Sequence, residues 1–161
     1  MTDWLLWAPL VAAAAHIVEE FVFPGGFPSW YRQYRANASR ITPRFLILMN
    51  AGLLVTCAEI AVIARQPAGA AAWLALAAIL ASNGCWHVWA SLRSHTYAPG
   101  AVTGALLYVP MALYGCVDFL RRGAVTPGVA VVALALGGSY QLWSSAYHKG
   151  STKRGETSPG N

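Results

Sequence analysis

The chain alternates long apolar runs with short segments of proline, glycine and charged residues. The apolar runs predict five membrane-spanning helices, near residues 4–23, 44–64, 69–92, 101–121 and 126–147. Each run is about 20 residues long, which is enough to cross the hydrocarbon core of a bilayer as an α-helix. Pro110 lies inside the fourth run and predicts a kink there. The predicted fold class is therefore all-α, an integral membrane bundle of about five helices.

The five runs fit one transmembrane domain, residues 1–148, followed by a polar tail. The tail, residues 149–161, is rich in Gly, Ser and Thr and predicts a disordered segment. The first run lacks the basic start of a signal peptide and contains two glutamates, so we interpret it as a retained helix. Residues 24–42 predict a loop with interleaved aromatic and basic residues. Such a loop suits contact with anionic lipids or a cover over a site opening.

Composition agrees with a membrane location. The chain is 57% hydrophobic and only 11% charged, whereas soluble domains carry roughly 25% charged residues. The net charge of +5 does not indicate nucleic-acid binding, because the basic residues lie in loops and in the tail. Aromatic residues near the predicted helix ends, Trp73 among them, match the belts that form at membrane interfaces.

The distribution of lysine and arginine predicts the orientation. With five spans, eight of the 11 basic residues fall on one side of the membrane and three on the other. Because basic loops stay in the cytoplasm, we expect the N-terminus outside and the C-terminus in the cytoplasm. The expected location is the bacterial inner (plasma) membrane.

Three ionisable residues interrupt the first apolar run. His16, Glu19 and Glu20 occupy positions i, i+3 and i+4, so they share an arc of about 100° on a helix. Each charge at bilayer depth costs on the order of 2.5–3.5 kcal/mol on insertion scales. A cluster of three therefore predicts a functional site, with a hydrogen-bonded packing cluster as the structural alternative.

Other polar residues are expected at the same depth. Asn83 and His87 form a second i, i+4 pair in the third run, and Tyr97 begins the fourth. At ~1.5 Å per residue, His16, Asn83 and His87 lie roughly 8–13 Å from the inner ends of their helices. The five-span arrangement thus predicts one polar layer in the cytoplasmic half of the membrane.

Imidazole and carboxylate groups on facing helices are typical of metal sites in helix bundles. The candidate ligands for Zn, Fe or Mn are His16, Glu20, Asn83 and His87, with Asn83 either a ligand or a neighbour of one. Spacing leaves open which glutamate faces the bundle, so Glu19 and Glu20 are both candidate catalytic residues. Tyr97 is a third, as a hydrogen-bond partner of a substrate or ligand.

Several functions are compatible with this pattern. We expect a membrane enzyme, metal-dependent and acting on a small apolar or lipid-like substrate. A metal-free isomerase or cyclase that uses a buried Glu and His is an alternative. A proton-coupled transporter and a structural membrane protein are others. The expected partners are membrane lipids, an apolar small molecule and, in a homo-oligomer, a second copy of the chain.

The polar motifs resemble those of a known family. His16-Ile-Val-Glu19-Glu20 resembles the motif that names the HXXEE family of predicted integral membrane proteins. That family also has a second histidine and a Tyr-x-Pro-Gly motif, and this sequence carries both in order, as Asn83-Gly-Cys-Trp-His87 and Tyr97-Ala-Pro-Gly100. Three ordered motifs over about residues 16–100 are more specific than the first motif alone. The resemblance implies a membrane location and a catalytic site, but no particular reaction.

Overall fold

The computed structural model describes residues 3–22, 26–34 and 42–143, and the tail predicted to be disordered lies outside them. All elements within these ranges are helical. They are α1 (Asp3–Val22), α2 (Gly26–Tyr34), α3 (Pro43–Ile63), α4 (Pro67–Ser94), α5 (Ala101–Thr103), the π-helical turn η2 (Gly104–Tyr108), α6 (Val109–Arg121) and α7 (Pro127–Gly138).

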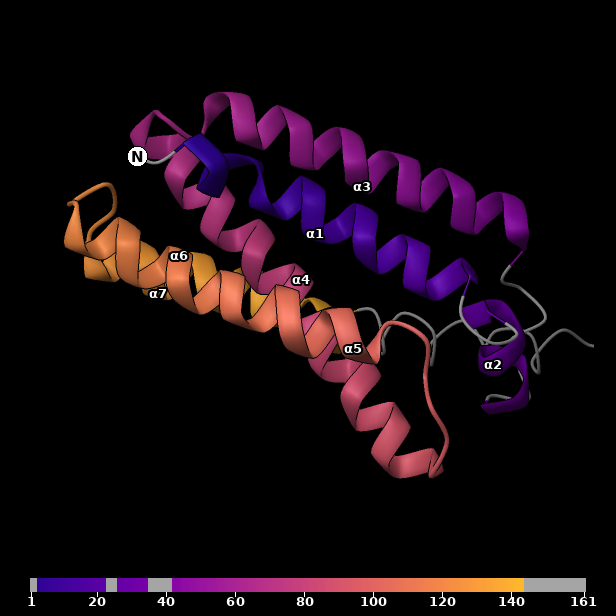
Figure 1. The fold of residues 1–161 in the computed structure, drawn as a ribbon. Coiled ribbons are helices and arrows are strands. Elements are labelled where there is room, and N and C mark those ends of the chain that lie inside the picture. Colours follow the sequence, from indigo (N-terminus) through magenta and orange to yellow (C-terminus); the bar gives the residue numbers. More distant parts are fainter. Residues whose placement is uncertain (1–2, 23–25, 35–41, 144–161) are drawn as a thin grey trace, which may run out of the picture.

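Among the described residues, four helical segments are long and apolar enough to cross a membrane. They are Trp4–Val22, Arg44–Ile63, Pro67–Ser94 and the continuous α5–η2–α6 segment, Ala101–Arg121. The all-α fold class is thus confirmed, and helix α7, with 12 residues, is not among these four candidate spans. In Figure 1, α1 and α3 lie side by side, and α7 packs along α4.

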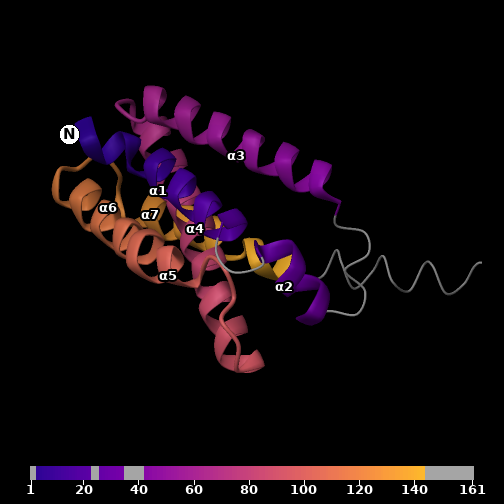
Figure 2. The same ribbon diagram turned by 45° about the vertical axis from the view of Figure 1, so that its right-hand side comes forward.

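The two ends of the bundle carry different connections. The start of α1 lies at the same end as the α3–α4 and α6–α7 turns (Figure 1). Helix α2 and the α4–α5 connection lie at the other end, as the rotated view in Figure 2 also shows. His16, Glu19 and Glu20 lie in the second half of α1, and Asn83 and His87 lie in the second half of α4. Both sets therefore lie toward the α2 end.

The predicted proline boundaries hold at two helix starts. The hydroxyl of Thr42 accepts a hydrogen bond from the Phe45 amide at 3.2 Å and caps α3, and Pro43 takes the first helical position. Thr126 caps α7 in the same way, through the Val129 amide at 3.3 Å. A proline at this position is tolerated because its missing N–H has no partner within the helix.

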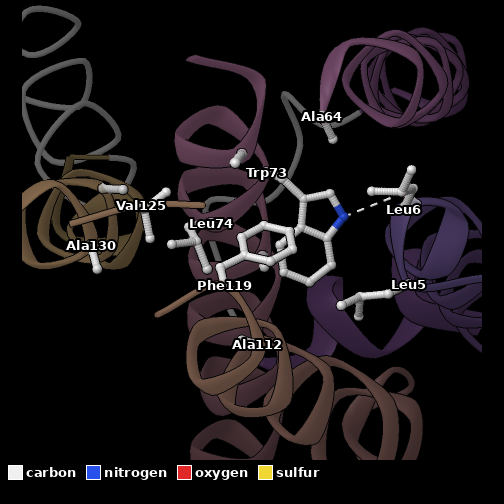
Figure 3. Close-up of a cluster of buried hydrophobic side chains, with 12 residues drawn as sticks. Leu5, Leu6, Ala64, Trp73, Leu74, Ala112, Phe119, Val125 and Ala130 are labelled. Carbon is white, nitrogen blue, oxygen red and sulfur yellow. Dashed lines mark hydrogen bonds between the residues drawn. The ribbon is translucent and has the colours of Figure 1, made fainter. Parts of the chain in front are cut away.

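Trp73 belongs to the apolar core, so its predicted place in an interfacial belt was wrong. Its side chain is 0% exposed and packs against Phe119, with ring centroids 5.0 Å apart, as Figure 3 shows. Its indole N–H donates to the Leu6 carbonyl at 3.3 Å. Gly115 makes room for the ring, because a Cβ there would lie 2.2 Å from the indole. The sequence pattern did not reveal this space.

At Pro110, where the sequence predicted a kink, the structure has a π-helical turn, η2, just before the proline. In an α-helix the proline ring would clash with the carbonyl of the residue four positions earlier, which here is Leu106. That residue lies within η2, where the Val109 amide bonds to the Gly104 carbonyl, an i→i+5 hydrogen bond. The wider turn accommodates the proline without ending the span.

Residues 26–34 form helix α2, although the sequence predicted a loop. Pro28 falls in the first turn of α2, where a proline costs no helical hydrogen bond. Trp30 is buried against α4, and its indole N–H donates to the Thr96 hydroxyl at 2.9 Å. The helix therefore lies over the C-terminal end of α4, as a cover would.

Candidate functional site

The carboxylate of Glu20 lies between two imidazoles. Its Oε1 atom is 3.5 Å from Nε2 of His16 and 3.2 Å from Nε2 of His87. His16 and His87 are 2% and 1% exposed, so both imidazoles are almost fully buried inside the protein. One ligand atom from each of the three residues lies within 4.8 Å of the other two. This geometry suits a shared cation or proton.

Two helices bring this group together. His16 and Glu20 stand one turn apart on α1, which aligns their side chains on one face. His87 comes from α4, and its ring meets the His16 ring edge-on with centroids 5.0 Å apart. These contacts, and not the spacing alone, place Glu20 rather than Glu19 at the imidazole pair.

Asn83 adjoins the group through its amide nitrogen. Its Nδ2 lies 3.3 Å from Nε2 of His16, and its Oδ1 accepts a hydrogen bond from Gln141 at 3.0 Å. The amide therefore turns a donor toward the imidazole. An N–H group is not a metal ligand, so Asn83 borders the candidate ligands in this arrangement.

Glu19 has different surroundings from its neighbour. Its carboxylate accepts five hydrogen bonds at the start of α5. Two come from the hydroxyls of Tyr97 and Thr103. Three come from the backbone amides of Gly100 (2.9 Å), Val102 (3.1 Å) and Thr103 (2.7 Å). These amides have no carbonyl partner within their own helix, and an anion at a helix N-terminus is stabilised. Glu19 thus fastens α1 to α5.

Tyr97 takes part in this second network. Its hydroxyl donates to Glu19, and the residue is 39% exposed at the connection between α4 and α5. Desolvation, followed by the hydrogen bond to the carboxylate, raises the pKa of Tyr97 above its ordinary value. The phenol therefore stays a neutral donor to Glu19 over the physiological pH range.

Gly100 separates the two networks, and only glycine fits there. Its φ of +100° lies in the left-handed region that disfavours other residues. A Cβ at this position would come within 2.7 Å of His16 Cε1 and 2.9 Å of His87 Cε1. The Tyr-x-Pro-Gly motif therefore has two physical roles: its tyrosine and the Gly100 amide bind Glu19, and its glycine admits both imidazoles.

Aromatic side chains enclose the imidazoles. The ring of Tyr108 lies 4.6 Å from that of His16, and Phe27 of α2 lies 5.1 Å from His87. Two buried polar atoms, the Tyr108 hydroxyl and Nδ1 of His87, have no hydrogen-bond partner among the described residues. An unpaired buried polar group costs about 1–3 kcal/mol, and such groups are often found at functional sites.

The structure therefore sorts the predicted residues into two groups. His16, Glu20 and His87 come together, with Asn83 beside them. Glu19 and Tyr97 bind each other in the adjoining network. Sequence reasoning missed Thr103 and Tyr108. Position gave a weak signal for each, since Thr103 closely follows the Tyr-x-Pro-Gly motif and Tyr108 precedes Pro110 by two residues.

Comparison with known proteins gives one match. A family model described as a protein of unknown function with an HXXEE motif matches residues 7–115, a range that includes His16, Glu19, Glu20, Asn83, His87, Tyr97 and Thr103. No curated protein and no solved structure matches the chain.

Proposed function

The chain belongs to the HXXEE family of proteins of unknown function, and we propose that it is a metal-dependent enzyme of the membrane. One observation carries this proposal: Glu20 Oε1 lies 3.5 Å and 3.2 Å from the Nε2 atoms of His16 and His87. Two imidazoles and one carboxylate are a common donor set for catalytic zinc and for non-haem iron.

The distances fit a shared ion. Ligands about 2.0–2.1 Å from a tetrahedral zinc lie about 3.4 Å from one another. The two measured separations, 3.5 Å and 3.2 Å, bracket that value. Three protein ligands leave one position for water or substrate, and a bound metal supplies Lewis acidity and an activated water there. Zn, Fe and Mn all accept this donor set.

The remaining residues take supporting roles in this proposal. Asn83 directs an N–H group toward the ligand atom of His16, where it is suited to hydrogen-bond an oxygen of water or substrate. Glu19 already accepts five hydrogen bonds, so we assign it to holding α5 in place rather than to proton transfer. We assign Tyr97 to the same task.

A substrate with an apolar body suits the surroundings of the site. The rings of Tyr108, Phe27 and Trp86 lie within about 5 Å of the two imidazoles. We propose a five-span topology in which residues 126–147 form the last span. The N-terminus is outside, and the site is in the cytoplasmic half of a bacterial inner membrane. A lipid-like substrate then enters from the inner leaflet.

Metal-free acid–base catalysis is the second candidate. The 3.2 Å contact between Glu20 Oε1 and His87 Nε2 is a hydrogen-bonding distance, and a carboxylate–imidazole pair can move a proton to and from an apolar substrate. Isomerisation or cyclisation would then be the reaction class. The two candidates differ in whether a metal is needed.

Elemental analysis of the detergent-purified protein separates them. We expect about one equivalent of Zn, Fe or Mn in the wild type and none in His16→Ala/His87→Ala. The matched control is His95→Asn, because His95 is exposed at the end of α4 with φ +51°, which asparagine tolerates. Absence of metal from the wild type after reconstitution with each ion would overturn the metal-dependent reading.

A second assay tests for catalysis. Metal-loaded protein and the double-alanine variant are each reconstituted with a bacterial lipid extract, and the lipids are compared by mass spectrometry. A species consumed only by the wild type identifies the substrate class. Identical profiles with a bound metal would favour a structural metal.

A further inference from the structure

We propose that Thr103 is a positioning residue for His16. Its hydroxyl, held by Glu19, keeps the imidazole proton on Nδ1, so that the Nε2 lone pair faces Glu20 and His87. The inference about the proton follows from hydrogen bonds alone, whereas its consequence for metal affinity rests on the proposed function. Neither Thr103 nor any other residue of α5 was among the predicted site residues.

The Thr103 hydroxyl has a single proton to donate. That hydroxyl donates to Oε2 of Glu19. Glu19 has to be ionised, since it accepts from three backbone amides and from Tyr97 as well, and an ionised carboxylate only accepts. The Thr103 oxygen can therefore only accept from Nδ1 of His16, 2.8 Å away. Nδ1 must carry the proton.

The opposite edge of the imidazole faces the Asn83 amide. In this arrangement Gln141 donates its Nε2 to Oδ1 of Asn83 at 3.0 Å. Asn83 then presents its Nδ2 donor to Nε2 of His16 at 3.3 Å. A donor facing Nε2 requires a lone pair there. The Asn83 donor, at 3.3 Å, lies nearer to Nε2 than the Glu20 oxygen, at 3.5 Å. Both edges of the ring thus favour the same tautomer, and that tautomer offers a metal its ligand atom.

Tyr108 packs on the face of the His16 imidazole. Thr103 and Tyr108 are five residues apart, which would place them about 140° apart around an α-helix. The π-turn η2 brings residues of this separation to one side, because its hydrogen bonds span five residues. Tyr108 accordingly lies on the face of His16, with centroids 4.6 Å apart, while Thr103 holds its edge. The imidazole is fixed in two directions.

Carboxylate partners that fix a ligating histidine are a general device at metal sites. Here the carboxylate of Glu19 acts through the hydroxyl of Thr103 rather than directly. The two glutamates of the HXXEE motif then have different roles. Glu20 faces the imidazoles, and Glu19 orients His16 through the Thr103 hydroxyl.

The test compares Thr103→Val, which has a similar shape but no hydroxyl, with Thr103→Ser, which keeps the hydroxyl. Thr56→Val is the matched control, because Thr56 is exposed on α3. Two quantities are measured: Zn²⁺ affinity by chelator competition, and the tautomer of His16 in metal-free protein by ¹⁵N NMR. Replacement of His95 by asparagine and of His148 by glutamine leaves only two histidine signals to assign.

We expect Thr103→Val to weaken Zn²⁺ binding about 10–100-fold and to shift the proton from Nδ1 to Nε2, where Glu20 is the nearest acceptor. Thr103→Ser should restore both, and Thr56→Val should change neither. If Thr103→Val does not fold, Thr103→Cys is used, because its sulfur is a weak acceptor and should shift both quantities in the same direction.

The outcomes separate this inference from the proposed function. A tautomer shift in Thr103→Val, in a protein that binds no Zn²⁺ even as wild type, supports the positioning role and overturns the metal-dependent reading. Wild-type Zn²⁺ binding, with neither quantity altered by Thr103→Val, overturns the positioning role and leaves the metal site standing. A wild-type His16 protonated on Nε2 also overturns the positioning role.

Discussion

Helices α1 and α4 pack against each other at both ends of the bundle, but with opposite chemistry. At one end, Leu5 and Leu6 of α1 lie in one apolar cluster with Trp73 of α4 and Phe119 of α6 (Figure 3). At the other end, His16 and Glu20 of α1 meet His87 of α4. The first end shows that these helices can be packed closely without any ionisable group.

This difference favours a functional reading of the polar end. Lipid is as apolar as these side chains, so moving a side chain from lipid into a helix contact gains little free energy. Close packing of complementary shapes therefore holds helices together in a membrane. The Trp73 cluster supplies such packing. Holding the helices together with two buried imidazoles and a carboxylate costs more free energy than apolar packing does. We therefore expect substitutions in the Trp73 cluster to change stability, and substitutions in the His16–Glu20–His87 group to change ligand binding.

Gly100→Ala should have the largest effect. The new Cβ would lie within 3 Å of both imidazoles, and the φ of +100° would be strained, so we expect loss of stability together with more than about 100-fold weaker Zn²⁺ binding. Gly123→Ala is the matched control. It also has a positive φ, +66°, but nothing lies within 4 Å of its Cβ position. Equal losses of Zn²⁺ affinity in both variants would contradict the contact with the imidazoles.

The adjacent glutamates should separate binding from stability. We expect Glu20→Gln to weaken Zn²⁺ binding by at least about 100-fold, because it removes a ligand and not merely a neighbour of one. Glu19→Gln should mainly destabilise the fold, by about 2–3 kcal/mol, because an amide N–H would face donors. It acts on Zn²⁺ binding only through Thr103, so it should weaken that binding less than Glu20→Gln does. Denaturation and chelator competition are measured on both variants. If the two effects are reversed, the assignment of the two carboxylates is wrong.

Phe119→Ala should lower stability without affecting the site. Phe119 is 0% exposed and packs on Trp73, so the cavity should cost about 3 kcal/mol, at the lower end of the range for buried aromatics. Leu113→Ala serves as the control, since Leu113 is 65% exposed on the same helix. A large change in Zn²⁺ affinity in Phe119→Ala would show that the two ends are coupled.

Tyr97→Phe should have the smallest effect, with a characteristic pH dependence. The pKa of Tyr97 is raised in the folded protein, so its hydrogen bond to Glu19 stabilises the fold fully below the unfolded pKa of about 10. That contribution, about 1 kcal/mol, is lost as pH rises toward the folded pKa. The difference in Tm between wild type and Tyr97→Phe should therefore shrink above about pH 10. Tyr114→Phe, on the exposed side of α6, should show no such trend.

The sequence was most informative where periodicity decides the structure. Long apolar runs predicted the all-α fold, and the i, i+4 pairs predicted that His16 shares a face with Glu20. Helix rise placed His16 and His87 at one depth, and these residues do lie together. These features depend on helical geometry alone, so they can be worked out without knowing how the helices pack.

The remaining features depend on contacts between distant segments. Glu19 and Glu20 are adjacent in sequence, and only the position of α5 shows that one caps a helix while the other faces the imidazoles. Trp73 is buried because Gly115 of another helix leaves room for its ring. Helix α2 lies against α4 through Trp30, whose indole N–H donates to the distant Thr96 hydroxyl. No local pattern indicates any of these partners.

The most direct test is the X-ray absorption spectrum of the metal-loaded protein at the metal edge, beside that of His87→Ala. The account predicts two imidazoles and a carboxylate oxygen at about 2.0–2.2 Å, with no sulfur ligand, and one imidazole fewer in the variant. A spectrum without imidazole ligands, or one unchanged by His87→Ala, would contradict the claim that His16, Glu20 and His87 form a metal site.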